Sequence, residues 1–169
     1  MALSGYLCLI LHSHLPFVRH VEHADSLEER WLFQAITESY LPLLDCLGRL
    51  SREGVRASLT VSLSPPLLEM LDDDLLKKRY KRHLFIMHDL ACKEIARLKG
   101  SRERPLAEMY KKRFERAYDM YTRELSEDIP SAWKRLHESG SVELMTTSAT
   151  HACLPLLIQD ESVTAQVKT

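Results

Sequence analysis

Two histidines follow the first predicted strand, and their spacing suits sugar binding, proton transfer or metal ligation. His12 and His14 come directly after the apolar segment Gly5–Leu11, and Pro16 ends the predicted strand. Residues two apart in an extended chain project to the same side, so both imidazoles should face one way. An imidazole can donate or accept a hydrogen bond, exchange a proton near neutral pH, or ligate a metal. Many metal-dependent barrel hydrolases also begin with His-x-His after a first strand.

A third histidine follows a cluster of hydroxyl side chains. The segment Thr146–His151 contains three threonines and a serine, and it lies at the end of the apolar strand predicted from Val142 to Ser148. In parallel α/β folds the carboxyl ends of the strands meet at one edge of the sheet, where ligands bind. We therefore expect His151 to converge with His12 and His14 on a polar pocket.

Trp31 is a candidate platform for a sugar ring. It lies near the start of a predicted helix, for which Ser26 and Glu29 fit a capping box. An indole has a flat apolar face with a polar edge and can stack on a sugar, although ordinary packing is the alternative. Trp133 lies in an amphipathic helix and is assigned to the core. The other histidines have no strand-end context and are interpreted as surface or packing residues: His20, His23, His83, His88 and His137.

Three segments are predicted to form the strands that position these side chains. They are Gly5–Leu11, Val55–Leu63 and Val142–Ser148. The first is apolar on both faces, which is typical of strands covered by helices on both sides or lining a parallel barrel. Long helical connections separate the three segments, so the strands should pair in parallel and the fold should be α/β.

The connection between the second and third strands is longer than a simple crossover requires. Asp72–Asp74 is suited to capping a long helix, Gly100–Pro105 predicts a turn, and a second helix should run over Leu106–Leu125. We therefore predict a helical hairpin insertion over about 72–125, with an aromatic stripe packed inside it. The basic run Lys77–Arg82 is interpreted as a solvated face.

Composition excludes several classes of protein. The chain has 169 residues, 45% hydrophobic and 28% charged, with a net charge of -1, so it has no electrostatic footprint for nucleic acid or an anionic membrane. It contains no apolar stretch of about 20 residues, no glycine-rich phosphate loop and no Gly-x-Ser-x-Gly elbow. We expect a cytoplasmic protein whose four scattered cysteines are free, buried thiols: Cys8, Cys46, Cys92 and Cys153.

Three ordered segments resemble family 57 of the glycoside hydrolases, and most of all its alpha-glucan branching enzymes. Gly5–His20 resembles the first signature region, Glu28–Leu44 resembles the adjoining segment of branching enzymes, and Val142–Leu157 resembles the second region. The resemblance covers residues 1–169 as the N-terminal portion of a catalytic domain. It departs at Ala152–Cys153, where the family usually has a glycine and an aromatic residue.

The resemblance implies a parallel β/α barrel of seven strands, of which this chain would form the first part. It also implies retaining transfer of glucan from an alpha-1,4 to an alpha-1,6 linkage, with a glutamate nucleophile and an aspartate acid/base. Both carboxylates belong to later signature regions, so we expect no catalytic residue here and an inactive isolated chain. Glu143 starts the third strand and is not assigned as the nucleophile.

By position, the resemblance assigns sugar binding to His12, His14, Trp31 and His151, without a metal or a cofactor. The expected partners are an alpha-glucan such as glycogen or amylose, and either the missing C-terminal part or a second copy of the chain. One alternative is a metal-dependent hydrolase or deacetylase that uses the three histidines as ligands. An acidic ligand at a strand end would support it, and none is evident. The other alternative is a non-catalytic carbohydrate-binding fragment.

Overall fold

The described residues of the computed structural model are 5–23, 25–55 and 57–168, and they divide into two compact units. Unit 1 comprises Met1–Val18, Cys46–Met70 and Pro130–Thr169, whereas unit 2 comprises Arg19–Asp45 and Leu71–Ile129. Within the described ranges, no helix is long and apolar enough to cross a membrane.

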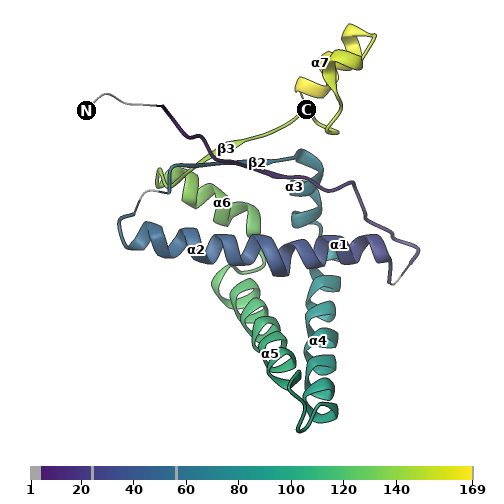
Figure 1. Cartoon of the computed structure of the whole chain (residues 1–169). Helices are drawn as coiled ribbons and strands as arrows, with labels where there is room; N and C mark the ends of the chain where they lie inside the picture. The colour runs from purple at the N-terminus through teal and green to yellow at the C-terminus, as the bar shows by residue number, and fades with distance from the viewer. Residues whose placement is uncertain (1–4, 24, 56, 169) are drawn as a thin grey trace. The chain divides into compact units, whose positions relative to one another are not determined.

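Unit 1 contains a parallel sheet of three strands, seen edge-on in Figure 1. The strands are β1 (Ile10–Ser13), β2 (Leu59–Leu63) and β3 (Val142–Met145), in the order β1-β2-β3. Both pairs are parallel, as the long helical connections predicted. The register places His12 opposite Ser62 on the neighbouring strand. All five residues of the central strand β2 are buried.

Each strand is shorter than the apolar segment that predicted it. β1 begins at Ile10 rather than Gly5, and Tyr6 and Leu7 are 93% and 96% exposed. The strand is short because β2 begins only at Leu59, since Ser58 has a φ of 47°, which an extended strand does not allow. Of the predicted second strand, Arg56 lies outside the described residues. β3 likewise ends at Met145 instead of Ser148.

The helices of unit 1 supply its apolar core. Trp133 is 1% exposed, as predicted, and Leu67 and Met70 are 0% and 1% exposed. Val61 of β2 is completely buried. Trp133 comes from α6, whereas Leu67 and Met70 come from α3. The helical elements that lie wholly or mainly in unit 1 are α2 (Leu41–Arg52), α3 (Pro65–Asp72), α6 (Ile129–Glu138), the 3₁₀ turn η3 (Leu154–Leu156) and α7 (Asp160–Lys168).

Unit 2 is helical and contains the predicted hairpin. α4 and α5 are its two arms (Figure 1), Gly100 turns between them with a φ of 81°, and no strand occurs between residues 72 and 125, all of which are described. Asp73 caps α4 by accepting a hydrogen bond from the Leu76 amide at 2.9 Å. The elements are α1 (Leu27–Ala35), the π-helix η1 (Ile36–Tyr40), the start of α2 (Leu41–Arg52), α4 (Asp74–Arg97), α5 (Arg104–Asp119) and the π-helix η2 (Met120–Glu124).

A buried ion pair in unit 2 corrects two predictions. The Ser26 hydroxyl accepts a hydrogen bond from the Glu29 amide, as the capping box predicted. The Glu29 carboxylate, however, is 1% exposed and accepts hydrogen bonds from the His20 amide and from Arg79 instead. The Arg79 side chain is only 13% exposed. The basic run Lys77–Arg82 is therefore not uniformly solvated, because Arg79 neutralises a buried acid.

The cysteines are free, as predicted, but the expectation that they are buried is wrong. Cys8, Cys46 and Cys153 are exposed and Cys92 is partly exposed. Cys8 precedes β1, and Cys153 lies in the loop after β3. Apolar neighbours in the sequence were therefore not sufficient to predict that these thiols are buried.

Candidate functional site

The three strand-end histidines converge in unit 1. The His14 and His151 rings stack with centroids 3.8 Å apart and an interplanar angle of 26°. The His12 ring lies 5.1 Å from that of His151 and 6.3 Å from that of His14. The Nε2 atoms of His12 and His151 are 3.0 Å apart, within hydrogen-bond distance. We name these three residues the histidine cluster, and its convergence is what the strand-end positions predicted.

Two buried serines hold the rings of the first strand. The Nδ1 atom of His12 lies 3.2 Å from the Ser62 hydroxyl, and the Nδ1 atom of His14 lies 2.9 Å from the Ser64 hydroxyl. Both serines are buried, with exposures of 6% and 0%. The parallel register explains the match, since His12 lies opposite Ser62, and His14 and Ser64 are the first residues after the paired strands end.

A tight turn after β3 carries the third ring. His151 has a φ of 58°, in the left-handed region, and its amide donates to the Ser148 carbonyl at 2.8 Å. The Ser148 hydroxyl donates to the Ala152 carbonyl at 2.8 Å, which closes the turn. From α7, Gln166 accepts a hydrogen bond from the Thr150 amide at 2.9 Å. The hydroxyl-rich segment is therefore a backbone support that aims the His151 ring.

The contact between His12 and His151 constrains the protons of the cluster. An Nε2-to-Nε2 hydrogen bond needs one ring to donate and the other to accept. Two imidazolium rings would both present N–H groups, so full protonation breaks this bond. The cluster in this geometry therefore contains at least one neutral imidazole and offers both donors and acceptors.

His14 has a pKa below its usual value. Burial lowers it from 6.5, and the neighbouring imidazoles of His151 and His12 lower it further. A neutral His14 ring can donate or accept a hydrogen bond at neutral pH. A neutral His14 ring at a strand end suits the recognition of uncharged hydroxyl groups.

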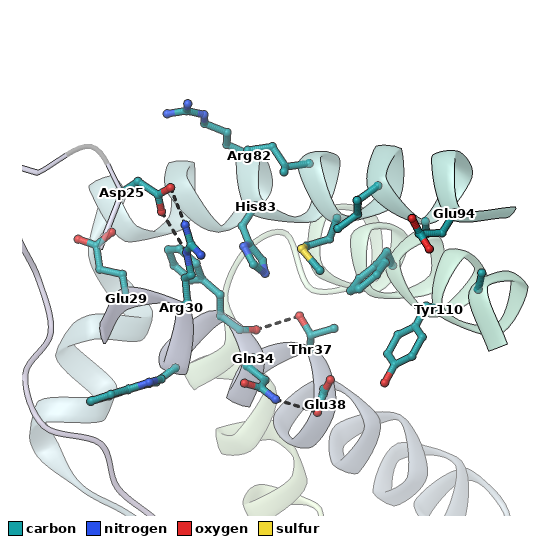
Figure 2. Close-up of a pocket in the computed structure, with 18 of the residues that line it drawn as sticks. Asp25, Glu29, Arg30, Gln34, Thr37, Glu38, Arg82, His83, Glu94 and Tyr110 are labelled. Atoms are coloured by element: carbon teal, nitrogen blue, oxygen red, sulfur yellow. Dashed lines mark hydrogen bonds and ion pairs between the residues drawn. The ribbon is translucent and has the colours of Figure 1, made fainter. Parts of the chain in front are cut away.

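Trp31 lies in unit 2, on α1, and is 47% exposed. It lines an open cavity of about 880 Å³, whose lining residues come mainly from α1, η1, α4 and α5 of that unit. In Figure 2, His83 reaches into this cavity from α4, Gln34 faces it from α1, and Tyr110 comes from α5. Burial, followed by the positive charge of Arg30, lowers the pKa of His83. Trp31 is thus neither fully buried nor fully exposed, and its role as a sugar platform stays a prediction.

Sequence reasoning missed the two serines that hold the cluster. Their signal was present, because polar residues alternate with apolar ones along β2 and the residue after it: Thr60, Ser62 and Ser64 against Leu59, Val61 and Leu63. It could not be used without the register, which only the paired strands define. Sequence reasoning also left His83 without a role, although it lines the cavity.

Neither a carboxylate pair nor a metal-binding group is evident at the histidine cluster. Glu143 accepts a hydrogen bond from the Thr60 hydroxyl at 2.6 Å. Thr60 lies two residues before Ser62 and so on the same face of the sheet. Within the described ranges, no three His, Cys, Asp or Glu side chains have an arrangement that could hold a metal ion. The chemistry visible at the cluster is hydrogen bonding and proton exchange.

Comparison with known proteins gives consistent relatives. The chain is 34% identical over 166 residues to the 1,4-alpha-glucan branching enzyme of Thermococcus kodakarensis, covering 98% of this chain and 24% of that protein. The GH57-type branching enzyme of Pyrococcus horikoshii matches with a TM-score of 0.89 and 34% identity, over 98% of this chain and 31% of that one. The alpha-amylase AmyC of Thermotoga maritima matches with a TM-score of 0.84 and 39% identity, over 95% and 30%.

These relatives confirm the predicted fold class. The chain spans about a quarter to a third of their lengths, and its three parallel strands with a helical hairpin match the first part of the family's seven-stranded β/α barrel. The comparisons do not favour the metal-dependent hydrolase or the separate carbohydrate-binding fragment. The sequence model of glycosyl hydrolase family 57 matches residues 8–169, so this chain belongs to glycosyl hydrolase family 57.

Proposed function

We propose that residues 1–169 form the N-terminal portion of the catalytic domain of an alpha-glucan branching enzyme and bind the glucan through the histidine cluster. The observation that carries this proposal is the convergence of three imidazoles at the strand ends of a family 57 chain. Sugar hydroxyls need partners that can both donate and accept, and neutral imidazoles do both. Trp31 would add an apolar face for a glucose ring in unit 2.

The proposed reaction is cleavage of an alpha-1,4 bond, with the glycosyl group held on a glutamate and passed to a 6-hydroxyl. The residues of this chain would orient the sugar, and the two carboxylates would come from the remaining part of the family protein. Hydrolysis of the same substrate class is the second candidate, because the Thermotoga relative is an alpha-amylase. Analysis of the products separates the two, since branching creates 1,6-linkages and hydrolysis creates new reducing ends.

The edges of the sheet support a partner from the rest of the protein. β1 and β3 each pair on one side only within the described sheet, and the edge residues Ile10 and Met145 are 53% and 47% exposed. Unpaired, apolar strand edges tend to associate. We propose that further barrel strands cover these edges, with self-association of the chain in their absence. The free thiols are consistent with a cytoplasmic location, which we also propose.

Binding of maltose to the isotopically labelled chain, followed by NMR, tests the proposal. We expect the ring signals of His12, His14 and His151 to move with maltose concentration, and an alanine at any one of them to weaken binding. His88→Ala is the matched control, because His88 lies on α4 and contacts Glu115. A maltose response that is equal in wild type and in all three cluster variants would exclude the cluster as the binding site.

The chain alone should not act on amylose. Retaining glycoside hydrolysis needs two carboxyl groups roughly 5 Å apart around the bond, and the histidine cluster has no such pair. We therefore expect no change in the iodine spectrum of amylose. A change that is lost in His12→Ala would mean that this chain carries its own catalytic carboxylates, with Glu143 the first candidate.

A further inference from the structure

We infer that Ser62 and Ser64 are positioning residues that set the orientation and tautomer of His12 and His14. This inference rests on the proposed function for its purpose, but its geometry stands apart from that function. Ser62 lies opposite His12 in the register of β1 and β2, and Ser64 and His14 are the first residues after those two strands end. Each serine hydroxyl is within hydrogen-bond distance of an Nδ1 atom, at 3.2 Å for His12 and 2.9 Å for His14.

The position of the serines in β2 argues against an incidental contact. A central parallel strand buried on both faces is normally an apolar run. β2 instead has an apolar face with Val61 and Leu63 and a polar face with Thr60 and Ser62, and Ser64 continues this alternation directly after the strand. A hydroxyl at 0% to 7% exposure needs a partner within the protein, because an unsatisfied buried polar group is costly.

Each polar side chain of that face has a partner on an adjacent strand or just beyond its end. On one side, Thr60 donates a hydrogen bond to Glu143 of the adjacent strand β3 at 2.6 Å. Ser62 and Ser64 contact the histidines on the other side. The same face thus contains two histidine-holding positions and one similar position that holds a carboxylate.

Engaging Nδ1 leaves Nε2 as the ring nitrogen that can meet a neighbour. For His12 that neighbour is Nε2 of His151 at 3.0 Å, so Ser62, His12 and His151 form one hydrogen-bonded chain. A change of donor at Ser62 must propagate to His151, because neutral His12 has only one ring N–H. Ser64 and His14 form a separate pair, since His14 contacts His151 by stacking. The two serines therefore control different sets of rings.

Nitrogen-15 NMR of the histidine rings at about pH 8, above the usual imidazole pKa of about 6.5, tests this inference directly. In the wild type we expect the two nitrogens of His14 to have widely separated signals, which is typical of one dominant tautomer. In Ser64→Ala the two His14 signals should move toward each other, because the ring loses its partner and samples both tautomers. Ser64→Thr, which keeps the hydroxyl, should restore the wild-type signals.

Ser62→Ala should change the signals of His12 and His151 together and leave those of His14 in place. Thr60→Val is the matched control, because it removes a hydroxyl from the same face of the same strand without touching a histidine. Unchanged His14 signals in Ser64→Ala, or equal changes in Thr60→Val, would overturn the inference. Maltose binding by each serine variant should be roughly two- to tenfold weaker, which corresponds to one neutral hydrogen bond.

The same experiments separate this inference from the proposed function. If the ring signals respond to the serines as expected but maltose moves no signal in the wild type, the positioning role stands and sugar binding is wrong. If maltose binding depends on the histidines but the ring signals ignore both serines, sugar binding stands and the positioning role is wrong.

Discussion

Replacing Arg79 with methionine should destabilise unit 2 more than any exposed charge substitution. The Glu29 carboxylate is 1% exposed, and its partners are the His20 amide at 3.1 Å and the Arg79 guanidinium, which is itself 13% exposed. Arg79 also donates to the His20 carbonyl at 2.7 Å, so it joins the loop before α1 to α4. Methionine fills much of the same space and removes the charge and both hydrogen bonds.

The expected loss is about 3–5 kcal/mol, because a buried acid is left without its counter-charge. Small domains have a total unfolding free energy of about 5–15 kcal/mol, so the effect is a large share of stability. Urea unfolding followed by circular dichroism measures it, and amide hydrogen exchange in α1 and α4 locates it. We expect the transition midpoint to fall with little change in its slope.

A second substitution separates the lost charge balance from lost packing. Glu29→Gln combined with Arg79→Met should recover a substantial part of the loss, since a neutral amide needs no counter-charge and can still accept from the His20 amide. Arg97→Met is the control, because Arg97 pairs with Glu94 at the exposed end of α4 and should change stability little. A loss below about 1 kcal/mol for Arg79→Met would refute the reasoning, since that is the range of surface ion pairs.

Three further predictions concern the histidine cluster, the core and the hairpin turn. The pKa of His14 is lowered from 6.5 in the folded chain, so its contribution to stability is fully present above pH 6.5 and is lost as pH falls through the lowered pKa. Urea midpoints measured from about pH 8 to about pH 5 should therefore fall less steeply in His14→Gln than in the wild type. Trp133→Ala should cost about 3–5 kcal/mol by urea unfolding, and Trp133→Phe clearly less, because among described atoms the buried Nε1 has no hydrogen-bond partner. Gly100→Ala should lower the unfolding free energy by about 1–2 kcal/mol, since φ is 81° there, whereas Gly48→Ala inside α2 should be neutral or stabilising.

The sequence predicted features that depend only on local rules. Helix periodicity with the turn at Gly100–Pro105 predicted the hairpin, and the strand-end rule predicted that His151 would meet His12 and His14. Both rules need only the type and order of elements. The strand-end rule works because parallel strands bring all their carboxyl ends to one edge of the sheet.

Features that depend on register or on a distant partner were not predictable from the sequence. The role of Ser64 depends on which residue of β1 lies beside it, and the role of Arg79 depends on a glutamate 50 positions earlier. Strand limits were wrong for the same reason, because the apolar segment at Tyr6 gives no sign that its neighbour starts at Leu59. Hydrophobicity alone predicts a strand but not the length of its partner.

The parallel register also makes this site sensitive to insertions and deletions. Loss of one residue between Ile10 and His12 would leave β1 able to pair with β2, because the backbone hydrogen bonds do not depend on the side chains. Since side chains alternate across a strand, the same loss would send both imidazoles to the opposite face, away from Ser62 and Ser64. The four residues of β1 cannot change in number without moving the imidazoles of His12 and His14. Functional homologues should therefore vary in length outside β1. An alignment gap within β1 would mark a chain that has lost the site.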